Sequence, residues 1–280
     1  MVKTKYRAGF YNNDLDGLYR GNFYDFKCGF NQNSHIMKNF LALTKTAMDL
    51  ENALPNYKRN ISFSELCLPE YKSDPSLKKK LIEKIKQDYP EYEQNKNKII
   101  IVCPDVGLNI RVRNYPKDNF VEVIKKITHN YPEHIVALIG VPENMDICKY
   151  VANKVNSKRC INFCSRTDSL KELFELLSFS EMLISNDNGP AHFAAITRTK
   201  TLAIFSTDSP FIYGPFGRCL ILYKFFQCSP CIYAFNHKKT RCNDNKCLQA
   251  IKPEEVYEAA VKVLSGNFNE RTVNNKLRYV

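Results

Sequence analysis

The chain has 280 residues, of which 44% are hydrophobic and 25% charged, so it has the composition of a soluble globular protein and not of a disordered one. Its formal net charge of +12 points to an anionic partner, either a phosphorylated substrate or an acidic membrane surface, although a solvated lysine-rich face is the simpler explanation. No nucleic-acid-binding motif accompanies the charge, and we expect no nucleic-acid partner.

The start of the chain and its apolar runs predict where the protein resides. Residues 1–5 lead into no apolar run, and the longest apolar stretch, 99–103, is far too short to cross a bilayer. Eleven cysteines in such a chain are expected to be mostly reduced thiols. The sequence therefore predicts a cytoplasmic protein, with peripheral contact at the inner face of the plasma membrane as an open alternative.

The first 95 residues are polar and irregular, and their apolar pattern predicts few elements. The expected elements are strands at 6–11 and 24–30 and helices over 34–49 and 75–87. The run 89–98 is rich in Pro, Glu, Asn and Lys, which is typical of a linker. We therefore predict two domains, 1–95 and 96–280.

From residue 98 onward, strand candidates alternate with helix candidates. The expected strands are 99–103, 135–140, 160–163, 182–185, 202–205 and 220–223, and the expected helices are 117–130, 143–155, 168–179, 190–196 and 253–264. Short β-branched runs separated by helices are typical of parallel strands that are covered on both faces. The sequence predicts an α/β fold with a doubly wound parallel sheet, which binds ligands at the carboxyl ends of its strands.

The loop after the strand at 182–185 carries the densest group of candidate substrate-binding residues. They are Asp187, Asn188, Gly189, Pro190 and His192. Gly189 permits a tight turn and Pro190 suits a first helical position, so the free N–H groups of the helix would face a ligand. His192 can donate to a phosphate, whereas Asp187 would bind loop N–H groups or sugar hydroxyls. The alternative is an ordinary capped turn with a core histidine.

Three further loops supply candidates. The hydroxyls of Ser206 and Thr207 suit a phosphate or a sugar, and Arg113 could bind a diphosphate through charge-assisted hydrogen bonds. Glu143 opens a helix, where it either reaches a ribose or merely favours the helix dipole. The same residue types also build plain turns, so each loop alone is ambiguous.

Four elements in this order resemble one known family, the heptosyltransferase-type glycosyltransferases of family nine. They are the Asp-x-Gly-Pro-x-His element at 187–195, an Arg-Asn-Tyr-Pro at 113–116, the turn and Gly-Pro-x-Gly at 206–217, and a Cys-x-Pro-Cys followed by Ile-x-Pro-x-x-Val at 228–231 and 251–256. The resemblance covers 98–265, the donor-binding half of the family, and Tyr115 and Asn188 are mild departures from its pattern.

The resemblance implies two Rossmann-like domains in a B-type glycosyltransferase fold, with 1–95 as a partial acceptor-side domain and 96–280 as the donor-binding domain. The implied reaction transfers a heptose or similar hexose-like unit, with inversion, from a nucleotide-diphosphate sugar to a lipopolysaccharide or other lipid-linked or polysaccharide acceptor. No metal or other cofactor is implied. The diphosphate leaving group would be stabilised by Arg113, the turn at 189–192 and the turn at 206–209.

One departure concerns catalysis. The family's opening strand and Gly-rich loop, which carry an acidic residue proposed as the base, have no counterpart here, so the sequence looks N-terminally truncated relative to the family pattern. Asp14, Asp16 and Asp25 are available, but none matches that position, and we assign no catalytic base. A non-catalytic nucleotide-sugar-binding protein and a nucleotide-sugar epimerase therefore stay open as alternatives.

The cysteines give one further ambiguity. Cys228, Cys231, Cys242 and Cys247, with His237 between them, are spaced as in a four-thiolate zinc site. We favour the alternative, that these are small buried residues packing a loop. The remaining candidates, Cys103, Cys148, Cys160 and Cys164, are expected in the core.

Overall fold

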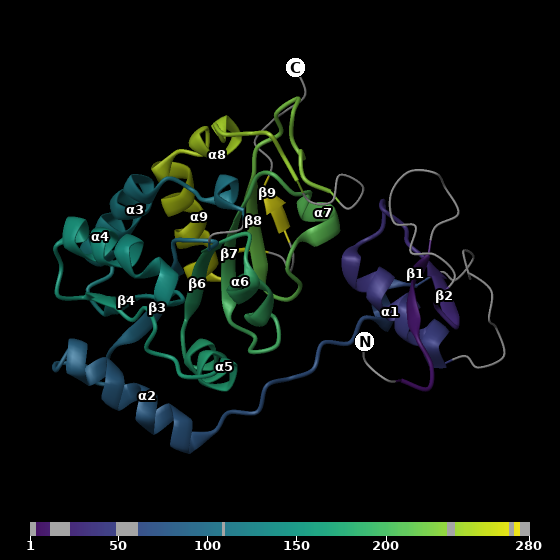
Figure 1. The fold of residues 1–280 in the computed structure, drawn as a ribbon. Coiled ribbons are helices and arrows are strands. Elements are labelled where there is room, and N and C mark those ends of the chain that lie inside the picture. Colours follow the sequence, from purple (N-terminus) through teal and green to yellow (C-terminus); the bar gives the residue numbers. More distant parts are fainter. Residues whose placement is uncertain are drawn as a thin grey trace. The chain divides into compact units, whose positions relative to one another are not determined.

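The computed structural model describes residues 4–11, 23–48, 61–107, 110–233, 239–268 and 272–274, whose fold is drawn in Figure 1. The chain divides into two compact units. The smaller draws on 1–68, 211–213 and 230–241, and the larger on 69–210, 214–229 and 242–280. Within the described residues, no helix has both the length and the apolar character needed to cross a membrane.

The smaller unit contains two short strands and a helix. β1 (Ala8–Tyr11) and β2 (Phe26–Gly29) pair in parallel, and α1 (Ile36–Met48) packs on both strands. A single 3-10 turn, η1 (Phe63–Glu65), follows among the described residues. The predicted strands and helix in this region are confirmed to within a few residues at each end.

The larger unit is built on a parallel sheet of seven described strands in the order β5-β4-β3-β6-β7-β8-β9. Their bounds are β3 (Lys98–Cys103), β4 (His134–Leu138), β5 (Cys160–Asn162), β6 (Met182–Asn186), β7 (Lys200–Phe205), β8 (Cys219–Tyr223) and β9 (Thr272–Asn274). The predicted α/β parallel sheet is confirmed. Only β9 was missed, because its three residues lie in a polar stretch without a strand-like apolar run.

Helices precede or connect these strands. They are α2 (Pro75–Asp88), α3 (Lys117–Asn130), α4 (Met145–Val155), α5 (Leu170–Ser178), α6 (Gly189–Phe193), α8 (Lys246–Gln249) and α9 (Pro253–Ser265), with 3-10 turns η2 (Arg111–Arg113) and η3 (Pro142–Asn144). Between β7 and β8 the chain forms α7 (Pro210–Tyr213), of which 211–213 belong to the smaller unit. The helix predicted over 190–196 is shorter than expected. The N–H groups of Ala195 and Ile196 bond three residues back, which tightens the chain into a 3-10 turn and ends α6.

The core is split between the two faces of the sheet. Alternate residues of β3 point to opposite faces, so Ile100 and Val102 join one cluster and Ile99 and Ile101 the other. α3, α4 and α9 cover the first face, and α2 and α5 cover the second (Figure 1). Both faces are therefore buried, as the β-branched runs predicted.

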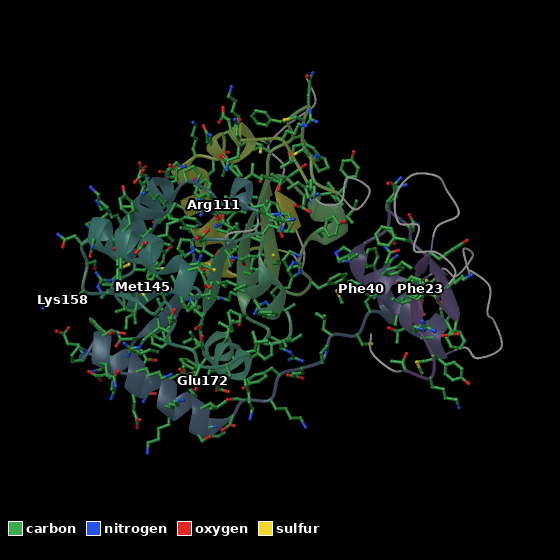
Figure 2. All side chains as sticks on the ribbon, viewed as in Figure 1. Phe23, Phe40, Arg111, Met145, Lys158 and Glu172 are labelled. Carbon is green, nitrogen blue, oxygen red and sulfur yellow. The ribbon has the colours of Figure 1, made fainter. Side chains whose placement is uncertain are left out.

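Helix α2 belongs to the larger unit, although the sequence placed it before the linker. Its Leu81 and Ile85 are fully buried in the core of that unit. Glu172 of α5, labelled in Figure 2, lies beside α2 and forms ion pairs with Lys80 at 2.6 Å and Lys84 at 3.2 Å. The structure therefore divides near residue 68 and not near 95, and two lysines of the basic helix are neutralised by α5.

At the amino-terminal edge of the sheet, Glu181 is held by three positive or proton-donating partners. His134 Nε2 lies 2.8 Å from its carboxylate, and the ammonium groups of Lys98 and Lys200 lie at 3.4 and 3.5 Å. The hydrogen bond from His134 is the main cause that lowers the pKa of Glu181 from 4.5 to about 2, with Lys98 and Lys200 adding to it.

The lowered pKa predicts an acid-sensitive contribution to stability. The ionised carboxylate of Glu181 contributes its full share of the unfolding free energy above its ordinary pKa of 4.5. This contribution is lost as the pH falls toward about 2. We expect Glu181→Gln to lower the unfolding free energy by about 1 kcal/mol at pH 7 and to have a smaller effect at pH 3. Urea unfolding at both pH values, with exposed Glu83→Gln as the control, checks this. An effect of Glu181→Gln that is the same at both pH values would contradict it.

Candidate functional site

A pocket of about 370 Å³ opens at the carboxyl ends of β3, β4 and β6. The chain runs outward from β3 through β4 to β5 and then returns to place β6 on the other side of β3. The strand order therefore reverses between β3 and β6, and a crevice at such a point is where doubly wound sheets bind ligands. Its volume lies in the usual range of small-molecule sites, roughly 300–1,000 Å³.

The pocket has an apolar wall and a polar wall. The apolar side chains are those of Val106, Ile139, Val141, Leu170, Leu173, Pro190 and Phe193, and the polar ones are those of Asp105, Asn144, Thr167, Asp168, Ser169 and Asn188. Among these lining residues there is no lysine or arginine. The pocket by itself thus suits an uncharged ring system with a few polar groups, and a bound phosphate would need a cation from beside it.

Part of the predicted loop lines this pocket. Asn188, Gly189 and Pro190 do so, as expected. Asn188 is fixed on both sides, because Ser185 Oγ donates to its Oδ1 at 2.6 Å and its Nδ2 donates to the carbonyl oxygen of Asp105 at 3.0 Å. Since α6 has only five residues, its dipole is weaker than the longer predicted helix would have supplied.

Arg113 does not line the pocket but belongs to an ion-pair cluster with Asp208 and with Asp187, the residue that directly precedes Asn188 of the lining. Its guanidinium contacts the carboxylate of Asp208 through Nη2, and its Nε lies 3.5 Å from Asp187 Oδ2. The side chain of Asp208 is 1% exposed and that of Asp187 7%, so both carboxylates are nearly removed from water. The charge predicted to bind a diphosphate is therefore matched by two carboxylates, and Asp187 contacts Arg113, a partner that the sequence did not indicate.

The turn after β7 packs inward. Ser206 and Thr207 are 2% and 1% exposed. Thr207 Oγ1 donates to Asp208 Oδ2 at 3.2 Å, and the carbonyl of Ser206 accepts from Ser229 Oγ. The predicted use of these hydroxyls on a ligand would thus require the turn to open.

Glu143 and His192 lie apart from the pocket lining. Both side chains are exposed, so the alternative of a core histidine is wrong. Glu143 belongs to η3, between Val141 and Asn144, which do line the pocket. Neither residue is brought to the pocket in this structure.

Two of the sequence elements that carried the resemblance, 113–116 and 251–256, meet at Tyr115, which also contacts the residue just before a third. Its hydroxyl donates to the carbonyl of Ile251 at 2.8 Å, and its backbone N–H donates to Asn186 Oδ1 at 3.0 Å. The ring is 1% exposed and packs edge-on against Phe120 at 5.2 Å. Tyr115 therefore joins the loop before α3 to the end of β6 and to the segment just before α9.

Comparison with known proteins identifies the family. The family model of glycosyltransferase family 9 (heptosyltransferase) matches residues 1–240. The chain belongs to glycosyltransferase family 9.

Relatives of this family 9 chain are distant. Lipooligosaccharide heptosyltransferase 2 of Campylobacter jejuni is 25% identical over 193 residues, which are 67% of this chain and 58% of that protein. The structure of ADP-heptose lps heptosyltransferase II from E. coli aligns with a TM-score of 0.64 at 14% identity, covering 89% of this chain and 68% of that one. An E. coli heptosyltransferase with ADP aligns with a TM-score of 0.52 at 13% identity, covering 86% and 60%. These structures show a shared fold, and the chain spans little more than half of the Campylobacter relative.

The four cysteines with zinc-like spacing are mostly not core residues. Cys228 and Cys242 are exposed and Cys231 is half-buried, so the packing interpretation holds only for Cys247. In the described part of the chain, no three His, Cys, Asp or Glu side chains are grouped to hold a metal, and His237 lies outside that part. Cys103, Cys148, Cys160 and Cys164 are buried as predicted. Burial raises the pKa of Cys103 to about 11 and that of Cys160 to about 12, which keeps these thiols protonated.

The structure assigns no catalytic base either. Asp14 and Asp16 lie outside the described residues. Asp25 accepts the backbone N–H of Arg7 at 2.8 Å and lies 3.9 Å from its guanidinium. An aspartate engaged in this way stabilises its own loop, and its contacts give no reason to assign it the proton transfer.

Sequence reasoning missed four polar residues around the pocket and the ion-pair cluster: Asp105, Asn114, Asn144 and Asp208. Asp105 and Asp208 each follow a predicted strand by two or three residues, so their position in a carboxyl-end loop was an available signal. Asn114 and Asn144 had no such signal, because their importance comes from contacts with Asp105.

Proposed function

We propose that this family 9 chain binds a nucleotide-diphosphate sugar, of the ADP-heptose type, in the pocket between β3 and β6. The whole protein would transfer the heptose, or a similar hexose-like unit, to a lipopolysaccharide or lipooligosaccharide acceptor with inversion. The observation that carries the proposal is the position of the pocket at the strand-order reversal of a family 9 chain. The relatives named for ADP, ADP-heptose and lipooligosaccharide support the choice of donor and acceptor.

The two walls suggest how the donor lies. The nucleoside would occupy the apolar wall, and the diphosphate would point toward Arg113, the nearby cation held by Asp187 and Asp208. Asp187 directly precedes Asn188 of the pocket lining, so the diphosphate need extend only past this loop. Arg113 would exchange a carboxylate for a phosphate and stabilise the charge that develops on the leaving diphosphate. Asp187 would then be released to accept hydrogen bonds from sugar hydroxyls.

The proposed acceptor is inferred from the net charge of the chain. The net charge of +12 suits a phosphorylated, lipid-linked acceptor and peripheral contact with an anionic membrane at the inner face of the plasma membrane. No residue is assigned as the base that deprotonates the acceptor hydroxyl.

A second candidate function is nucleotide-sugar binding without turnover. The lack of an assigned base among the described residues favours it, because sugar transfer needs a group that takes the proton of the acceptor hydroxyl. The two candidates share the donor site and differ in whether sugar is released. The family match gives the epimerase alternative no support.

Calorimetric titration with ADP and UDP tests the shared site. We expect ADP to bind with a micromolar Kd, and Val141→Trp, which places an indole on the pocket wall, to weaken binding at least about tenfold. Lys149→Trp, on the exposed side of α4, is the matched control and should bind as the unmodified protein does. Absence of binding by the folded protein would overturn the proposal, whereas binding without sugar release from ADP-heptose and an acceptor would select the second candidate.

A further inference from the structure

One carboxylate at the pocket wall gathers an unusual number of hydrogen bonds. Asp105 Oδ1 accepts from the backbone N–H groups of Val106 at 2.7 Å and Gly107 at 3.3 Å. The same oxygen accepts from Asn114 Nδ2 at 2.6 Å, and Oδ2 accepts from Asn144 Nδ2 at 2.6 Å. The carboxylate is thus surrounded by four donors.

These donors come from different loops of the sheet edge. Val106 and Gly107 follow β3, Asn114 precedes α3, and Asn144 belongs to η3 after β4. The turn after β3 depends on Gly107, whose φ of +81° is a left-handed conformation that side chains disfavour. The carboxylate of Asp105 therefore ties together the turn after β3, the loop before α3 and the loop after β4.

The loop after β6 is tied to the same residue through its backbone. Asn188 Nδ2 donates to the carbonyl oxygen of Asp105 at 3.0 Å. Asp105, Val106, Gly107, Asn144 and Asn188 all line the pocket, so every loop that forms its polar wall at β3, β4 and β6 contacts this one residue.

The two asparagines are oriented by further contacts. Asn144 Oδ1 accepts the backbone N–H of Val141 at 3.1 Å, and Asn114 Oδ1 accepts that of Val106 at 2.9 Å. Each amide therefore has its oxygen on a backbone N–H and its nitrogen on Asp105. A 180° rotation of either side-chain amide would place its NH₂ group against a backbone N–H, so the orientation of both amides is fixed. Both NH₂ groups therefore need a hydrogen-bond acceptor at residue 105.

We propose that Asp105 is a positioning residue of this pocket, which holds the loops after β3 and β4 in the arrangement that admits a nucleotide. It acts through Asn144 and Asn114 and not by touching the ligand. The ligand part of the inference rests on the proposed function, whereas the loop-holding part does not.

A residue exchange tests the role with the net charge unchanged. Asp105→Asn keeps Oδ1 but replaces Oδ2 by an NH₂ group that faces the NH₂ of Asn144, so two donors meet. Asn144→Asp alone places two carboxylates together. When the two changes are combined, the new amide at 105 donates to the new carboxylate at 144, and the backbone N–H of Val141 keeps its acceptor.

Two readouts follow this cycle, after circular dichroism has shown that each variant is folded. We expect hydrogen exchange at the amides of Val106, Gly107 and Val141, measured without ligand, to quicken at least about threefold in each single variant and to return near the original rate in the double variant. The Kd for ADP should rise about tenfold in each single variant and recover in the double variant.

The outcomes separate the inference from the proposed function. Exchange rates that do not change in the single variants, or do not recover in the double variant, would overturn the positioning role. Recovered exchange with ADP binding still lost would also overturn it, because Asp105 would then act on the ligand directly. If the original protein does not bind ADP, the proposed function fails, and the exchange cycle alone decides whether Asp105 positions the loops.

Discussion

Replacing Arg113 with alanine is expected to lower the unfolding free energy by about 3–5 kcal/mol and to abolish ADP binding. The substitution removes the cation that contacts both Asp187 and Asp208. Because their side chains are only 7% and 1% exposed, both carboxylates would stay largely buried without this cation. Urea unfolding and calorimetric titration with ADP measure the two effects.

The neighbouring Arg111 provides the control. It lies in the same 3-10 turn, η2, but its side chain is exposed. Arg111→Ala should therefore change the stability by less than about 0.5 kcal/mol. Adding Asp208→Asn to Arg113→Ala should restore part of the stability, because one buried charge is removed, but should not restore ADP binding. A loss below about 1 kcal/mol in Arg113→Ala would show that the ion-pair cluster contributes little to the fold.

Glu175→Ala is expected to cost about 3 kcal/mol of unfolding free energy. Glu175 is fully buried on α5 and accepts from Tyr71 Oη at 2.9 Å, Ser73 Oγ at 2.7 Å and the backbone N–H of Asp74 at 2.7 Å. These contacts attach the segment before α2 to α5. Removing the carboxylate leaves the three donors without this acceptor and creates a void at a fully buried position of α5.

Helix propensity cannot account for such a loss, because alanine favours a helix at least as well as glutamate does. Glu83→Ala on the exposed side of α2 is the matched control and should be nearly neutral. Thermal and urea unfolding check both variants. A neutral Glu175→Ala would mean that the segment 71–74 is held by other contacts, such as the ion pair of Asp74 with Lys171.

Most of the larger unit could be predicted from the sequence, because its elements have strong periodic patterns. The helix predicted over 117–130 has the bounds of α3, whose apolar residues recur at helical spacing and are buried against the sheet. Six strands were predicted for a similar reason, as short β-branched runs between helices. The division near residue 68 could not be predicted, because it depends on the burial of Leu81 and Ile85 against α5 and the sheet.

The pocket residues that could be predicted from the sequence are those that lie together in a single loop. Asn188, Gly189 and Pro190 follow a predicted strand and contain turn residues, and they line the pocket. The pairing of Arg113 with Asp187 and Asp208 joins loops after three different strands, so no local pattern indicates it. The contacts of Asp105 with Asn114 and Asn144 are hidden for the same reason.

Hydrogen exchange in the presence of saturating ADP tests most directly whether the nucleotide occupies the pocket between β3 and β6. We expect ADP to slow exchange in the segments that line it, 103–107, 139–144, 167–173 and 188–193. A second hollow of about 300 Å³, between 94–99 and 178–181, lies at the amino-terminal edge of the sheet and serves as an internal control. Slower exchange at that edge, or no change anywhere at saturating ADP, would contradict a donor site at the carboxyl ends of the strands.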